Sequence, residues 1–85
     1  MSYRLTLAAT AQRQLGGLPE RYALAIVEFM TGPLVDNPLV VGKELQGPLT
    51  GLRSARRGVY RAIYRIDDDQ VIVLRVDHRS DVYRL

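Results

Sequence analysis

The chain has 85 residues, close to the smallest size at which one hydrophobic core stabilises a domain, so we expect a single domain over residues 1–85. It has no cysteine and one histidine, which excludes disulfides and leaves too few ligands for a zinc centre, and we expect neither a metal nor a cofactor. No apolar run approaches the roughly 20 residues that span a bilayer, and the start MSYRLTL is unlike a signal peptide, so we expect a cytoplasmic protein without a membrane partner.

The positive charge is concentrated in the C-terminal part of the chain. Residues 1–50 carry four basic and four acidic side chains, whereas residues 51–85 carry eight arginines and five aspartates. Five arginines fall within thirteen positions without an intervening carboxylate, namely Arg53, Arg56, Arg57, Arg61 and Arg65. This clustering predicts a basic face that binds an anionic partner such as nucleic acid. The alternative is a solvated arginine-rich face in a chain that favours arginine over lysine.

The N-terminal half predicts one strand and two helices. Residues 3–8 alternate as a strand, and a short helix follows from Thr10, a candidate cap, to about Leu15. Gly16-Gly17 ends that helix, and a second helix begins at Pro19. Gly32-Pro33 predicts a kink, with a helical continuation to about residue 35. The second helix has a core-facing stripe at helical spacing, formed by Leu18, Tyr22, Ala25, Ile26, Phe29 and Met30.

The C-terminal half predicts strands at residues 52–56, 59–66, 71–78 and 82–84. They follow an irregular connector at residues 38–50, in which one short helical or extended piece around residues 43–45 is left open. The three aspartates at 67–69 predict a hairpin between the second and third of these strands. Alternation places Tyr60, Ala62, Tyr64 and Ile66 opposite Arg61, Ile63 and Arg65. In the next strand it places Ile72, Leu74 and Val76 toward the core, opposite Val71, Val73, Arg75 and Asp77.

Together these elements predict an α+β fold of the order strand, helix, helix and four strands, with the two helices packed on one side of a small, mostly antiparallel sheet. Arg61, Arg65 and Arg75 are then expected on the opposite, exposed surface. His78 points to the core side, where a structural histidine is the more common case.

The chemistry that remains rests on arginine, tyrosine and one histidine. The chain has no Gly-rich phosphate loop, and Ser54 and Ser80 have no His–Asp arrangement beside them. RNA can be cleaved by its own 2′-hydroxyl if charge on the phosphorane is stabilised and protons are moved. Arginines supply the charge, and a tyrosine among cations has its phenolate favoured. A slow nuclease that depends on a large partner for substrate orientation fits this composition.

Four motifs run along nearly the whole chain. They are an A-x-R-x-L…LP opening (Ala11, Arg13, Leu15, Leu18, Pro19), an NP…GK-L connector (Asn37, Pro38, Gly42, Lys43, Leu45), the centre G-x-x-S-A-R-R-G-x-Y-R-x-x-Y-x-I-D from Gly51, and an HR…VY ending. The centre and the ending together are a specific combination. The sequence resembles the RelE/ParE superfamily of bacterial toxins from type II toxin–antitoxin modules, closest to the RelE branch, which implies the RelE-like fold.

The resemblance implies a ribosome-dependent endoribonuclease that cuts mRNA in the decoding site and stops translation. It also implies a cognate RelB-like antitoxin, whose complex contacts operator DNA. By motif position, Arg61 corresponds to the phosphate-stabilising arginine, Tyr83 to the catalytic tyrosine, and Arg79 to an arginine proposed as acid or charge stabiliser. Arg53, Arg56 and Arg57 stand where relatives contact RNA, and Arg65 and Arg75 are expected to extend that surface.

The chain departs from the pattern at one point. Some relatives carry lysines just before the YR strand, offered as general bases, where this chain has Leu52, Arg53 and Ser54. Arginine stays protonated and is a poor base, so the identity of the base is open. Two other functions remain as alternatives: a ParE-like toxin that inhibits gyrase by binding it, and an interaction module whose partner is its antitoxin.

Overall fold

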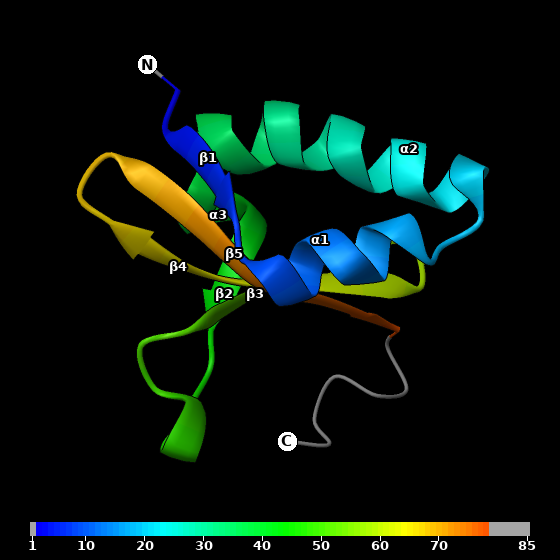
Figure 1. Ribbon diagram of the computed structural model, residues 1–85. Helices are drawn as coiled ribbons and strands as arrows, with labels where there is room; N and C mark the ends of the chain where they lie inside the picture. The colour runs from blue at the N-terminus through cyan, green and yellow to red at the C-terminus, as the bar shows by residue number, and fades with distance from the viewer. Residues whose placement is uncertain (1, 79–85) are drawn as a thin grey trace.

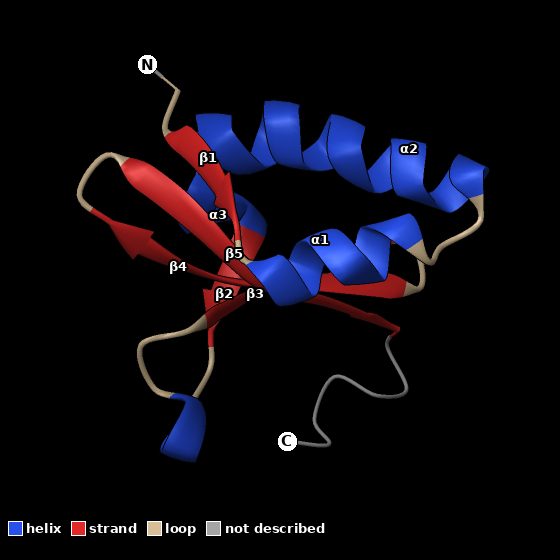
Figure 2. Ribbon diagram, viewed as in Figure 1, coloured by secondary structure: helices blue, strands red, loops and turns tan. Residues whose placement is uncertain are grey.

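The computed structural model describes residues 2–78, which form a layer of helices over a five-stranded sheet (Figures 1 and 2). In chain order the elements are β1 (Arg4–Leu7), α1 (Ala9–Gly16), α2 (Glu20–Phe29), a π-helical turn η1 (Met30–Leu34), α3 (Pro38–Val41), β2 (Gly42–Glu44), a 3₁₀ turn η2 (Gly47–Leu49), β3 (Arg53–Arg57), β4 (Tyr60–Asp67) and β5 (Gln70–His78). None of the helices described here is long and apolar enough to cross a membrane.

The sheet has the order β1-β5-β4-β3-β2, in which β1 runs parallel to β5 and the other neighbours are antiparallel. The α+β prediction, with α1 and α2 on one side of a mostly antiparallel sheet, is therefore confirmed (Figure 1). The expected element order is incomplete, because α3 lies within the segment predicted as a connector and the short piece left open around residues 43–45 is the edge strand β2. The strand expected at residues 82–84 lies outside the described residues.

The helices follow the predicted pattern with two corrections at their ends. Thr10 lies inside α1 and accepts a hydrogen bond from Arg13, while Ala8 takes the cap position without a side-chain bond. Gly17 ends α1 with a φ of −92°, so the glycine is not needed there for a left-handed conformation. The predicted helical continuation to about residue 35 is confirmed, and at η1 a π-helical turn accommodates Pro33, a residue without a backbone N–H.

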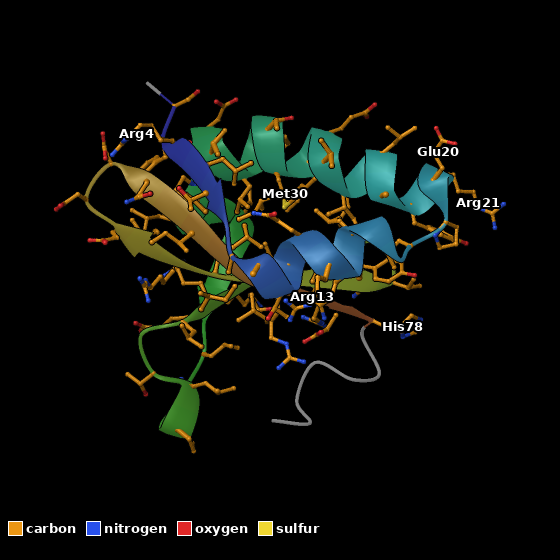
Figure 3. The ribbon with its side chains drawn as sticks, viewed as in Figure 1. Arg4, Arg13, Glu20, Arg21, Met30 and His78 are labelled. Atoms are coloured by element: carbon orange, nitrogen blue, oxygen red, sulfur yellow. The ribbon has the colours of Figure 1, made fainter. Side chains whose placement is uncertain are left out.

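The helix layer and one sheet face enclose the core. Ile26 and Met30 from the second helical segment are almost fully buried against residues of the central strands, including Tyr64 and Val73. Met30 points from the helix layer toward the sheet (Figure 3). Four residues of the apolar stripe read from the sequence join the core, namely Leu18, Ile26, Phe29 and Met30. Ala11 and Leu34 join it from outside the stripe, whereas Tyr22 is 37% exposed.

Strand β5 contains a bulge that corrects the predicted faces of its first half. Ile63 pairs with Arg75 and Tyr64 with Val73, so Leu74 has no partner among the described residues of β4. The extra residue reverses the alternation, because two residues of β5 oppose one of β4. Val71 and Val73, predicted to face outward, are fully buried, whereas Val76 is buried as predicted. Arg75 and Asp77 remain on the face of Arg61, as expected.

An ion pair ties β1 to the turn between β4 and β5. The Arg4 guanidinium lies 2.8 Å from Asp69 Oδ1, and this hydrogen bond lowers the pKa of Asp69 from its ordinary 3.8. A carboxylate with a lowered folded-state pKa contributes stability above its ordinary pKa, and that contribution is lost as the pH falls through the lowered value.

We expect Arg4→Gln to raise the pKa of Asp69 toward its ordinary value, as measured by carboxyl-carbon NMR titration. Arg21→Gln, on α2, is the matched control and should leave the midpoint unchanged. An unchanged Asp69 midpoint in Arg4→Gln would show that the ion pair is not formed in solution.

Candidate nucleic-acid interface

The sheet face turned away from α1 and α2, here called the open face, carries cations from three neighbouring strands. Cross-strand pairing places Lys43 beside Ser54, and Ser54 beside Ile63. In the adjacent row, Arg56 lies directly opposite Arg61. Side chains of paired residues share a face, so the register alone brings Lys43, Arg56 and Arg61 to one surface.

These side chains border a hollow in the open face. Its volume is about 240 Å³, and its lining consists of Val41, Lys43, Ser54, Arg56 and Arg61. The Ser54 hydroxyl and the Arg61 Nε are buried, and neither has a hydrogen-bond partner among residues 2–78. Like charges directly across a ladder are destabilising, so the Arg56–Arg61 pair favours a bound anion. The hollow therefore has the charge and the free donors to hold an oxoanion such as phosphate.

A buried carboxylate holds the neighbouring arginine. Asp77, which is 5% exposed, lies across the ladder from Arg61 and forms an ion pair with Arg75, whose Nε is 2.6 Å from Asp77 Oδ2. The geometry of this contact does not form a hydrogen bond, so the interaction between the two side chains is an ion pair. The ion pair therefore lies beside Arg61 on the open face, outside the lining of the hollow.

Gln14 fixes this carboxylate from α1. Its Nε2 donates to Asp77 Oδ1 at 2.7 Å, and its Oε1 accepts from the Val76 backbone N–H at 2.7 Å, at the part of β5 that extends beyond β1. Both bonds are partly buried, and each such hydrogen bond contributes about 0.5–1.5 kcal/mol to stability.

We expect Gln14→Leu to lower the free energy of unfolding by about 1–3 kcal/mol in urea titrations. Gln12→Leu, which removes an exposed bond from α1 to the Leu7 carbonyl, should cost less than about 1 kcal/mol. Equal losses in the two variants would show that Gln14 has no special role.

The structure separates the arginines that were predicted to contact RNA. Arg56, Arg65 and Arg75 lie on the open face with Arg61. Arg53 and Arg57 lie on the helix side of the sheet, because they pair with Tyr64 and Tyr60, whose side chains face α2. Arg79 and Tyr83 fall outside the described residues, so their expected approach to Arg61 stays a prediction. His78 faces the helix side as expected, but it is exposed and packs edge-on against Tyr60, with ring centroids 5.6 Å apart.

Lys43 and Ser54 line the hollow, and neither was among the residues expected to bind substrate. Two signals in the sequence pointed to them. Lys43 is the single lysine of the chain, and Ser54 is two residues from Arg56, which places both on one face of a strand. The position of Lys43 depends on β2, whose pairing with β3 joins Lys43 to Ser54, eleven positions further along the chain.

The comparisons with known proteins agree with this fold. The sequence profile of the family described as ParE toxin of type II toxin-antitoxin system, parDE, matches residues 5–83. Two relatives from Mycobacterium tuberculosis are the toxin RelG, 52% identical over 99% of both chains, and the toxin RelE, 48% identical over 98% of this chain and 88% of the relative. A crystal structure of the toxin–antitoxin complex RelBE2 from the same organism has a TM-score of 0.89 at 51% identity, covering 93% of this chain and 100% of that one.

These matches define the class of the protein as a small toxin with helices on one face of a sheet. The chain belongs to the RelE/ParE superfamily of toxins from type II toxin–antitoxin systems.

Proposed function

We propose that this toxin is an endoribonuclease that cleaves mRNA in the decoding site of the ribosome and so inhibits translation. The observation that carries the proposal is the hollow in the open face, where Lys43, Arg56 and Arg61 meet and no acidic side chain of the described residues joins the lining. Relatives named RelG and RelE, at about half identity over nearly the whole chain, support the same branch.

In the proposed reaction the RNA supplies the nucleophile, so the protein needs no metal to generate one. The 2′-oxygen loses its proton and attacks the adjacent phosphorus, and the bond to the 5′-oxygen breaks as that oxygen gains a proton. Arg61 stabilises the charge on the pentavalent phosphorane between these steps. By motif position, Arg79 and Tyr83 move protons or stabilise charge, while Arg56, Arg65 and Arg75 hold the flanking RNA backbone.

We propose a RelB-like antitoxin as the regulatory partner, through which the complex reaches operator DNA. An apolar groove of about 300 Å³ lies between α2 and the β3–β4 turn, lined by Tyr22, Ala25, Ile26, Val59 and Tyr60, with Arg57 and Gly58 beside them. Tyr22 and Val59 are each 37% exposed there. An amphipathic antitoxin segment with acidic flanks would cover this apolar surface and pair with Arg57. A toxin of this type acts in the cytoplasm, where the ribosomes are.

Mapping mRNA 5′ ends after brief induction of the toxin tests the proposal. The expected result is new 5′ ends within translated codons, which disappear when translation initiation is blocked. Intact mRNA in cells whose growth has stopped would overturn the nuclease assignment.

A second function is favoured by the matching family profile, which is described as a ParE toxin. In that case the toxin would inhibit DNA gyrase by binding it. DNA damage signatures without mRNA breaks after induction would identify this activity and separate it from the proposed nuclease.

A further inference from the structure

We propose that Lys43 binds a substrate phosphate in the hollow and that Arg53, on the opposite face of the sheet, is the positioning residue that holds Lys43 there. The inference rests on the proposed function, because it assigns two residues to the same site. Arg53 was expected to contact RNA directly, but its side chain lies on the helix side. Its effect on activity would therefore be transmitted through the protein.

Lys43 lies on a strand with little support of its own. Strand β2 has three residues and stands at the edge of the sheet, so β3 is its single strand partner in the described part of the chain. A short edge strand frays unless other contacts hold it. Lys43 can project into the hollow with a defined direction only if the chain from α3 into β2 is fixed from elsewhere.

Arg53 and Tyr64 provide that fixation from the helix side. The Arg53 guanidinium donates to the carbonyl oxygens of Leu39 at 3.2 Å and Gly42 at 3.1 Å, and the Tyr64 hydroxyl donates to the Pro38 carbonyl at 2.5 Å. Burial raises the pKa of Tyr64, although Arg53 opposes the shift, so the phenol keeps its proton and remains a donor. The three bonds secure both ends of α3.

The Gly42 carbonyl links this anchor to the site. This carbonyl belongs to the peptide group that joins Gly42 to Lys43. The hydrogen bond from Arg53 therefore fixes the orientation of the peptide plane that precedes the Lys43 Cα. Gly42 itself is buried against the Tyr64 ring. On the other face, Lys43 lies beside Ser54, whose buried hydroxyl lacks a partner among the described residues. An ammonium group with three rotatable donors, next to Arg56 and Arg61, completes a site for one oxoanion.

The test compares wild type, Lys43→Gln, Arg53→Gln and the double variant by single-turnover cleavage of mRNA on programmed ribosomes, with toxin concentration varied. Lys43→Gln should weaken the apparent affinity about tenfold with a smaller change in the maximal rate, because a charged bond to substrate is lost before the chemical step. Arg53→Gln should cause a similar loss of apparent affinity in the wild-type background and little further loss in the Lys43→Gln background. Lys43→Arg should restore most of the affinity.

Additive losses would overturn the positioning role, since a direct RNA contact by Arg53 acts independently of Lys43. Full affinity in Lys43→Gln would overturn the binding role. Arg57→Gln, on the same strand and side as Arg53 but at the far end from α3 and β2, is the matched control and should show no coupling to Lys43. If Arg53→Gln does not fold, Tyr64→Phe replaces it, because it removes the bond to the Pro38 carbonyl and should show the same coupling.

An assay without ribosomes separates this inference from the proposed function. Inorganic phosphate added to the isolated toxin should shift the amide NMR signals of Lys43, Ser54 and Arg61. In Lys43→Gln, the phosphate affinity obtained from these shifts should be about tenfold lower. Phosphate-induced shifts that are unchanged by Lys43→Gln would contradict the assignment of Lys43 whether or not the toxin cleaves mRNA. If the wild-type toxin binds phosphate but does not cleave mRNA, this result would instead contradict the nuclease activity.

Discussion

Arg61→Ala is expected to reduce the maximal rate of mRNA cleavage on the ribosome by about a hundredfold to a thousandfold, as found when one preorganised donor to a developing charge is removed. Arg61 lines the hollow, and its Nε is buried without a partner among residues 2–78, so this donor is free to bind the phosphorane. The measurement is single-turnover cleavage at saturating toxin, which separates the chemical step from binding.

Two controls define this result. Arg21→Ala removes an exposed arginine at the start of α2 and should leave the rate within about twofold of wild type. Arg61→Lys keeps the charge but loses the planar fork, so we expect an intermediate rate. Cleavage by Arg61→Ala at the wild-type rate would remove Arg61 from the mechanism.

Gly42→Ala is expected to be the most destabilising small substitution in β2. A Cβ at Gly42 would overlap the Tyr64 hydroxyl and approach the Ser54 carbonyl oxygen to 3.0 Å. Both neighbours belong to the central part of the sheet and have little room to move, so the overpacking should cost about 1–3 kcal/mol. For a domain of this size, each kcal/mol lowers the melting temperature by about 4–8 °C, which thermal unfolding followed by circular dichroism would detect.

Two comparisons test whether the loss of stability in Gly42→Ala comes from the contact with Tyr64 or from replacing glycine by alanine in general. A Cβ added to Gly16, at the end of α1, would have open space around it to 4 Å within the described part of the chain, so Gly16→Ala should be neutral or stabilising by up to about 1 kcal/mol. In the Tyr64→Phe background, where the overlapping hydroxyl is absent, Gly42→Ala should lose less stability than in wild type. An equal loss in both backgrounds would show that the close approach to Tyr64 is not the cause.

The parts of the fold that the sequence predicted well are those with local patterns. The stripe in α2 gives the helix and its buried side, and the alternation of Tyr60, Ala62 and Tyr64 gives β4 and its core face. The hairpin at residues 67–70 follows from its aspartates, and Asp68 adopts a φ of 54°, which aspartate tolerates better than most residues.

The features that were missed or left open depend on distant partners. Gly42–Glu44 has no alternation of its own and becomes a strand because β3 lies beside it. The bulge at Leu74 depends on how β5 aligns with β4, which the composition of β5 does not show.

The division of the arginines, by contrast, was open to inference. Arg56 and Arg57 are adjacent in a strand, so they must lie on opposite faces, and Ala55 in the core identifies the side on which Arg57 lies. Applied to Arg53, the same alternation gives the helix side.

The bulge at Leu74 gives β5 one residue more than β4 needs opposite it. Upstream of Leu74 the odd-numbered residues face the helices, and downstream they face the open face, so odd positions of one strand serve two surfaces. A chain lacking only that leucine would have a regular ladder, in which Val73 still lies opposite Tyr64 and Arg75 still lies opposite Ile63. The extra residue is therefore dispensable for the outward placement of Arg75 and Asp77.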